Sequence, residues 1–273
     1  MLRMESESGW WLITHRDHAR LAGDFAAEWG NAQFRRPEPR ERVLHGIATH
    51  DDGWVARDAR PSITREGKPS AFSTELVGKY AAFEEIDLND YLAVRAQAVR
   101  VIADEDPYAG LLISMHTYNL LTEHADRSTI TRENLRLLDA FLDHQRAYQS
   151  ELDGRVATDR SLTPEEKSGD RIVENFRLLQ ACDNLSLLAS VAFSSPSHLL
   201  HPLAMNDGSA KEVRVFPLGE RHFRLSPWPF TEKELRFFLP ARHVGRKFFA
   251  TSGQLEEAYL LAQEKTLTVT LVK

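Results

Sequence analysis

Residues 45–54 read HGIATHDDGW, and the adjacent pair His50-Asp51 is the most informative feature of this sequence. Imidazole and carboxylate groups are both common ligands of divalent transition metals. A His-Asp pair at the end of a helix can place the two groups beside one ion. The significance of the pair therefore depends on whether other helices supply further ligands of the same kind.

The chain around this pair is patterned for helices. From Thr14 to about Ser195, apolar residues recur mostly at helical spacing, and proline and glycine fall largely at breaks. Thr14 followed by Asp17 is a capping pattern that predicts a helix through Trp29. A second helix is expected at residues 38–51 and should end at Gly53. Further helices are predicted at residues 87–104, 108–124 and 131–152, the last of which begins with a weaker capping pattern, Thr131 followed by Asn134. A further helix or helix pair is predicted from about Pro164 to Ser190.

The last part of the chain changes to a strand-like pattern. Strands are predicted at residues 212–217, 222–225, 234–239 and 266–272, with Pro240 among the residues that break or flank them. A short aromatic and aliphatic run at residues 9–13 should pair with a later strand as an edge strand. We therefore predict a mainly α protein, in which a helical domain at 1–198 carries a small antiparallel β-module at 199–273.

Composition excludes several classes of function. Of 273 residues, 42% are hydrophobic and 27% charged, which is typical of a soluble globular protein. The single cysteine, Cys182, excludes a disulfide framework and a cysteine-rich zinc site, so a metal must be held by histidine and carboxylate. The net charge of −6 argues against general nucleic-acid binding. No apolar run approaches the roughly 20 residues that cross a bilayer, so we expect a cytoplasmic protein without a membrane partner.

Four further residues are candidates to complete a metal site with the His-Asp pair. His18 lies in the first predicted helix, Asp183 in the last, and His116 and His124 in a helix between them, eight residues apart and on similar sides. Ordinary alternatives stay open: His18 competes with His15 and could be a surface residue, and Asp183 could bridge two helices. His116 could be a hydrogen-bonded core histidine, and His124 could bind carbonyl groups at the helix end.

The order His18, His50-Asp51, Asp183 resembles the signature of the HD-domain superfamily of metal-dependent phosphohydrolases. It appears here in HRDHARLAG, THDDGW and ACDNLSLLA. The resemblance implies an HD-like helical bundle in which these four residues bind one divalent metal. In binuclear members the Asp of the pair bridges two ions and additional histidines bind the second, which implies that role for His116 and, less directly, for His124. Trp54 stands where the cyclic-dinucleotide branch has lysine, which argues against that activity.

The resemblance also implies an activity. We expect a hydrolase that acts on a phosphate ester or a nucleotide-like small molecule with one or two ions of Mn, Fe, Zn or Co. Metal-bound hydroxide would attack phosphorus, Asp52 would orient the water, and His116 would bind a second metal or orient the leaving group. The chain could also form a homo-oligomer. Two other functions remain as alternatives: a di-iron oxygenase of the same superfamily, and a non-catalytic sensor that binds a metal or ligand. HDDGW together with SMH is also similar to an uncharacterised bacterial family of unknown function.

Overall fold

The computed structural model describes residues 1–73, 88–123 and 130–273. Two of its helices begin at the threonines that the sequence marks as caps. The Thr14 side chain accepts a hydrogen bond from the Asp17 backbone N–H at the start of α1 (His15–Glu28). Thr131 accepts one from the Asn134 N–H at the start of α7 (Arg132–Thr158). Both predicted helix starts are confirmed.

The other long helices follow the predicted ranges, with one exception. They are α2 (Arg40–Thr49), α5 (Leu88–Glu105), α6 (Pro107–Glu123) and α8 (Gly169–Ser190). The exception is α8, which begins after its cap Ser168 and not near Pro164, because the Ser168 side chain accepts from the Arg171 N–H. Residues 163–166 form a separate turn. Shorter helices are η1 (Asp52–Trp54), α3 (Val55–Asp58) and α9 (Ser252–Leu261), and none of these three was predicted.

Within the described residues the main sheet has seven strands, in the order β1-β2-β8-β9-β7-β6-β3. It is mixed, because β7 runs parallel to β9 while the other neighbours are antiparallel. Its strands are β1 (Leu2–Glu5), β2 (Trp10–Ile13), β3 (Ser197–His198), β6 (Arg214–Gly219), β7 (His222–Ser226), β8 (Glu234–Val244) and β9 (Glu264–Val272). A separate pair is formed by β4 (Leu203–Ala204) and β5 (Ala210–Lys211).

The predicted fold class, a mainly α HD-like bundle with a small C-terminal antiparallel β-module, is wrong. The sheet is large and mixed, and β1 and β2 from the N-terminus form one end of it. Residues 9–13 do pair with a late strand, β8, but β1 is the edge strand. Pro240 does not break β8, because β2 pairs only with residues 242–244. At Pro240 only β9 lies beside β8, so the missing N–H removes no bond to β2.

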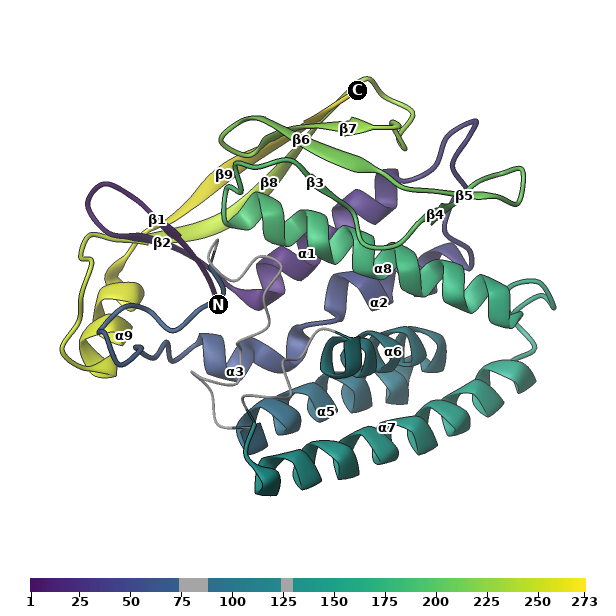
Figure 1. Cartoon of the computed structure of the whole chain (residues 1–273), viewed down its shortest axis with the longest axis horizontal. Coiled ribbons are helices and arrows are strands. Elements are labelled where there is room, and N and C mark those ends of the chain that lie inside the picture. Colours follow the sequence, from purple (N-terminus) through teal and green to yellow (C-terminus); the bar gives the residue numbers. More distant parts are fainter. Residues whose placement is uncertain (74–87, 124–129) are drawn as a thin grey trace.

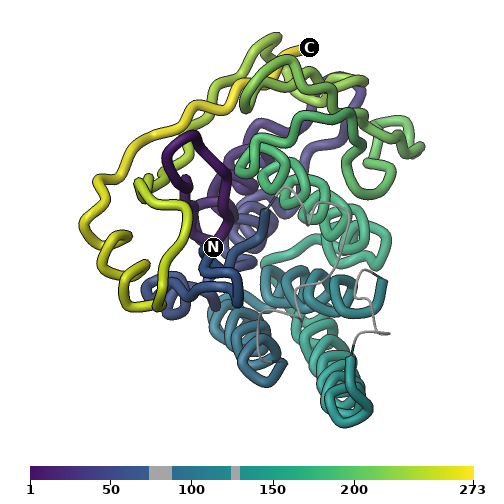
Figure 2. The backbone as a smooth tube through the Cα atoms, turned by 60° about the vertical axis from the view of Figure 1, so that its left-hand side comes forward, coloured from purple at the N-terminus to yellow at the C-terminus, as the bar shows by residue number. Residues whose placement is uncertain are grey.

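One hydrophobic core joins the sheet to the helices. In Figure 1, α1 and α8 lie next to the sheet, whereas α5, α6 and α7 lie on the side away from it. Phe25 of α1 packs on Phe237 of β8 with ring centroids 4.8 Å apart, and the same core includes Leu112 of α6 and Cys182 of α8. Figure 2 shows the N-terminal strands beside the C-terminal part of the chain. The residues between the sheet and the outer helices are therefore shielded from solvent.

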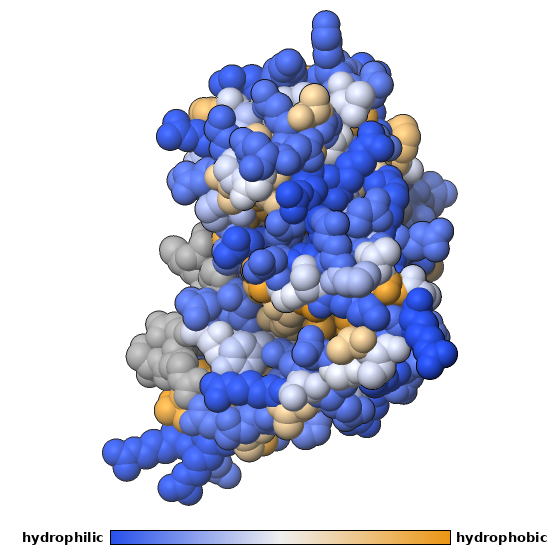
Figure 3. All heavy atoms as spheres, turned by 90° about the vertical axis from the view of Figure 1, so that its right-hand side faces the viewer, coloured by the Kyte–Doolittle hydropathy of each residue, from blue (hydrophilic) through white to orange (hydrophobic). Residues whose placement is uncertain are grey.

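The surface is mainly polar on the face drawn in Figure 3, where hydrophobic areas are small and scattered. Within the part of the chain that the structure describes, no helix combines the length and the apolar character needed to cross a membrane.

Candidate metal centre

Five of the predicted ligands meet where α1, α2, α6 and α8 approach one another. His18 comes from α1, His50 and Asp51 follow α2 directly, His116 lies on α6 and Asp183 on α8. All five are buried, and none is more than 6% exposed. Ligand atoms of His18, His50 and Asp51 lie within 4.8 Å of one another, as do those of His50, His116 and Asp183. His50 belongs to both groups, so these buried histidines and aspartates form one cluster that could hold a metal ion.

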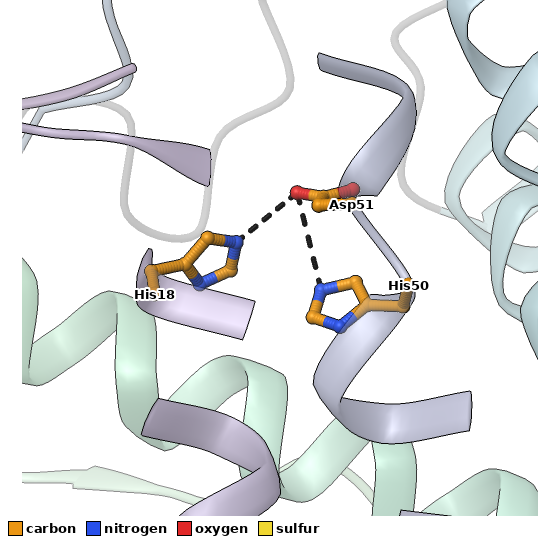
Figure 4. A group of neighbouring side chains, drawn as sticks. All are labelled: His18, His50 and Asp51. Atoms are coloured by element: carbon orange, nitrogen blue, oxygen red, sulfur yellow. Dashed lines mark hydrogen bonds and ion pairs between the residues drawn. The ribbon is translucent and has the colours of Figure 1, made fainter. Parts of the chain in front are cut away.

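His18 is held at both ring nitrogens. Nδ1 lies 2.8 Å from the Ser186 Oγ, and Nε2 lies 3.0 Å from the Asp51 Oδ2. Figure 4 shows the His18 ring turned toward Asp51. The Ser186 hydroxyl donates its proton to the backbone carbonyl of Asp183 at 2.8 Å, so its oxygen can only accept from His18. Nδ1 therefore carries a proton. In a neutral ring, Nε2 then presents its lone pair to the Asp51 carboxylate.

His50 is arranged in the same way. Its Nδ1 donates to the Ile47 carbonyl at 2.7 Å, which leaves the lone pair of a neutral ring on Nε2. This Nε2 lies 3.2 Å from the Asp183 Oδ1 and 3.9 Å from the Asp51 Oδ2, yet forms no hydrogen bond with any described residue. Burial lowers the pKa of His50, but the carboxylates of Asp51 and Asp183 outweigh burial and raise it to about 9. The surroundings of Nε2 therefore attract positive charge.

Arg95 on α5 is part of the site, although the sequence analysis did not identify it. Its guanidinium donates from Nη1 to the Asp51 Oδ1 and from Nε to the Tyr91 hydroxyl at 3.2 Å. Burial raises the pKa of Asp51, but the positive charge of Arg95, followed by that of His50, outweighs burial and holds this pKa well below its ordinary value. Asp51 is therefore ionised, with one oxygen paired to Arg95 and the other facing His18.

The sequence did contain a signal for Arg95. The residue lies three positions after Leu92 and four before Val99, so it falls on the apolar face of the predicted helix. Leu92, Arg95 and Val99 are all buried in the structure. An arginine on a buried helix face needs an anionic partner. The pattern could have revealed the burial of Arg95, but not that its partner is Asp51.

His116 and Asp183 complete the second group of the cluster. The His116 Nε2 lies 3.9 Å from the Asp183 Oδ2, and its ring centroid lies 5.1 Å from that of His50. Burial lowers the pKa of His116 to about 3, so its ring is neutral. Burial raises the pKa of Asp183, but the hydrogen bond and charge of His50 outweigh burial, and the net shift is downward. Neutral imidazole and ionised carboxylate are the forms that bind metals.

The remaining candidates are placed differently. Among the described residues, Asp52 and His15 lie outside both ligand groups. Asp52 is partly exposed at the start of η1, where a carboxylate oxygen lies 3.3 Å from the Arg16 Nε. The His15 Nδ1 lies 3.0 Å from an Asp58 oxygen, so this ring nitrogen is paired outside the cluster. His124 lies outside the described residues.

Comparisons with known proteins identify the family of the chain but not its function. Neither the curated proteins nor the solved structures gave a match to the chain. The model of the family described as "Protein of unknown function (DUF3891)" matches residues 1–246, a range that contains the whole cluster. The chain therefore belongs to this family.

Proposed function

We propose that the protein is a metal-dependent hydrolase whose centre binds one divalent transition-metal ion through His18, His50, Asp51 and Asp183, with His116 as a further ligand. The observation that carries the proposal is the state of two rings. In His18 and His50 the Nδ1 proton is committed to an oxygen acceptor, so Nε2 is the nitrogen left to bind a metal, and it faces carboxylate oxygens. Buried acceptors that face one another need a positive charge between them.

A metal ion would satisfy these acceptors better than protons would. A proton can lie between one nitrogen and one oxygen, whereas an ion can bind several of these atoms at once. Histidines that bind metals commonly donate their other N–H to a backbone carbonyl or another oxygen, as His50 donates to Ile47. Imidazole and carboxylate ligands without cysteine suit Mn, Fe, Zn or Co.

Arg95 favours one ion over two. In a binuclear centre Asp51 would bridge the two ions, most simply with one oxygen for each. Its Oδ1 is instead paired with the buried guanidinium of Arg95, which brings its own positive charge to that side. Only the Oδ2, which faces His18 and His50, is then available for a metal. The di-iron oxygenase, which needs two ions, is therefore less favoured than the hydrolase.

The proposed reaction is hydrolysis of a phosphate ester or of a nucleotide-like small molecule. A bound ion would supply a water of lowered pKa and a Lewis acid for a phosphoryl oxygen. Arg95 keeps Asp51 ionised, and the acceptors at Ser186 and Ile47 keep two imidazole lone pairs turned toward the centre. The ligand order along the chain, which resembles that of HD-domain phosphohydrolases, supports this reaction.

Elemental analysis of protein purified without added metal or chelator tests the centre. We expect about one equivalent of Mn, Fe, Zn or Co per chain. Asp51→Ala should lose it, whereas Asp153→Ala, at an exposed position on α7, should retain it. Equal metal content in wild type and Asp51→Ala would refute the site. Two irons per chain would favour the oxygenase.

Hydrolysis is tested on the metal-loaded protein with p-nitrophenyl phosphate, bis(p-nitrophenyl) phosphate and nucleoside triphosphates. We expect cleavage that stops on chelation and is absent in His50→Gln. His144→Gln, which changes an exposed histidine on α7, serves as the control and should retain activity. A protein that binds one ion but cleaves none of these esters would support the sensor instead.

A further inference from the structure

A series of polar contacts connects the metal centre to the part of the chain beyond α8. Gln180 on α8 is fully buried, and its amide nitrogen lies 2.9 Å from the Asn119 Oδ1 and 3.4 Å from the His116 Nδ1. Its amide oxygen lies 2.6 Å from the His201 Nε2. His201 follows β3 and precedes β4. The loop between these strands therefore contacts a candidate ligand through one side chain.

His201 has a backbone conformation that is uncommon for a residue other than glycine. Its φ is +61°, in the left-handed region that asparagine and glycine enter more easily. Its ring lies near Phe176 of α8, with centroids 6.1 Å apart. A strained residue persists when its surroundings fix it, and strained residues cluster at functional sites. The short contact with Gln180 is one such restraint.

The orientation of the Gln180 amide decides which nitrogen of His116 carries the proton. An amide nitrogen only donates, so it faces a lone pair on the His116 Nδ1 and leaves the proton of the neutral ring on Nε2. A metal ligand that binds through Nε2 needs the opposite tautomer, with an acceptor beside its Nδ1–H. A half-turn of the amide brings the Gln180 oxygen to His116. The amide nitrogen then faces His201, whose Nε2 must now carry the lone pair.

We propose that Gln180 and His201 are positioning residues that set the tautomer of His116 and thereby the affinity of the centre for its metal. The inference rests on the proposed metal site. No net proton is gained or lost, because each imidazole exchanges one neutral tautomer for the other. The amide of Asn119 turns at the same time, so that it donates to the Gln180 oxygen instead of accepting from the nitrogen. The β3–β4 loop thus takes part in metal binding without touching the ion.

Zn²⁺ titrations in competition with a chromogenic chelator test the role of Gln180. Two variants at this position are expected to change the Zn²⁺ affinity differently. Gln180→Met removes the acceptor and should weaken Zn²⁺ binding ten- to hundredfold, the usual effect of losing a partner of a metal-binding histidine. Gln180→Glu supplies a carboxylate that accepts from both rings and should bind Zn²⁺ at least as tightly as wild type. If Gln180 only fills space in the core, the buried carboxylate would be the more damaging change. Weaker binding by Gln180→Glu than by Gln180→Met would overturn the proposal.

His201→Asn separates metal binding from fold stability. Asparagine adopts the left-handed conformation more readily than histidine, so thermal unfolding without Zn²⁺ should occur at the same temperature or higher. Zn²⁺ affinity should nevertheless fall, because the shorter side chain does not reach Gln180. His198→Asn, at an exposed position in β3, should change neither quantity.

The ¹⁵N shifts of the imidazole nitrogens provide a second readout, which does not depend on activity. In wild type, the His116 Nδ1 should change from unprotonated to protonated when Zn²⁺ is added, and His201 should change its tautomer with it. If wild type binds Zn²⁺ while all three variants at positions 180 and 201 bind it equally well, this inference is wrong and the metal site stands. If wild type binds no metal ion, both the site and the inference are wrong.

Discussion

The Nε2 of His18 lies 3.0 Å from the Oδ2 of Asp51, although the only proton of a neutral His18 ring is held at Nδ1 by Ser186. This nitrogen and the ionised oxygen can face each other inside the protein only with a proton or a metal ion between them. The His50 Nε2 lies 3.2 Å from an Asp183 oxygen, and the His50 pKa of about 9 keeps a proton on this nitrogen at neutral pH in the metal-free protein. Without a proton or a metal ion on these two Nε2 atoms, the centre would have more acceptors than donors, and this excess makes it suited to a cation.

Ser186→Ala should weaken metal binding without unfolding the protein. The change removes the acceptor that holds the His18 proton on Nδ1, so the ring is free to adopt the wrong tautomer or orientation. We expect a loss in Zn²⁺ affinity of about tenfold or more, measured by chelator competition. Ser150→Ala, on the exposed side of α7, is the matched control. An unchanged affinity in Ser186→Ala would mean that the tautomer of His18 does not matter.

Arg95→Met should strongly destabilise the protein when it is prepared with a chelator. It leaves the Asp51 charge buried without its guanidinium partner, a kind of loss that costs about 3–5 kcal/mol. Metal should recover part of this loss, because the ion brings positive charge to the same carboxylate. Urea unfolding with and without Zn²⁺ measures both effects. Arg57→Met breaks a pair at 3.9 Å in which Asp90 is exposed and Arg57 partly exposed, and it should cost about 1 kcal/mol or less. Equal losses in the two variants would contradict the role of Arg95.

The stability of chelator-treated protein should fall as the pH rises from about 6.5 to above 9. The pKa of His50 is raised in the folded protein from its ordinary 6.5 to about 9, so the folded state favours the charged ring. The resulting stabilisation is fully present below the unfolded pKa and is lost as the pH passes through the folded pKa, a total of about 3 kcal/mol. Urea unfolding across this pH range measures it. In His50→Gln the slope should be much smaller, and a slope as steep as in wild type would assign the titration to another group.

Local sequence signals predicted individual helices well, because one or two neighbouring residues decide where a helix starts. Thr14 and Thr131 act through backbone groups three residues away, and both were identified. His18, Asp51 and Asp183 could be proposed as ligands because their order resembles the HD-domain signature. The order of residues along the chain does not show which hydrogen bonds orient each imidazole ring.

Contacts between distant segments were not predictable in the same way. β1 and β2 have four residues each, too few to show a clear alternation, and they become strands by pairing with each other and with β8. The partner of Arg95 and the contact between Gln180 and His201 depend equally on tertiary packing. The size of the sheet was underestimated for this reason, since strand pairing joins residues far apart in sequence.

Gly53 was expected to end the helix that precedes it, but α2 ends at Thr49 and Gly53 lies within η1. Its role is to allow close packing. A Cβ at this position would lie 2.4 Å from the Val94 backbone oxygen and 2.9 Å from the Ala98 Cβ, both on α5. Because α5 also carries Arg95, the distance between η1 and this helix determines how Asp51 meets its guanidinium partner.

Gly53→Ala should therefore affect both stability and metal binding. The added methyl must push η1 away from α5, at a cost of about 1–3 kcal/mol for overpacking. The shift also loosens the Asp51–Arg95 pair, so Zn²⁺ affinity should fall together with stability. Gly154→Ala on α7 is the control, since no described atom lies within 4 Å of its Cβ position, and alanine there should stabilise the helix by about 0.5–1 kcal/mol. Chemical unfolding and Zn²⁺ titration of both variants measure these opposite changes. A Gly53→Ala protein with wild-type stability and affinity would mean that the spacing between η1 and α5 does not control the centre.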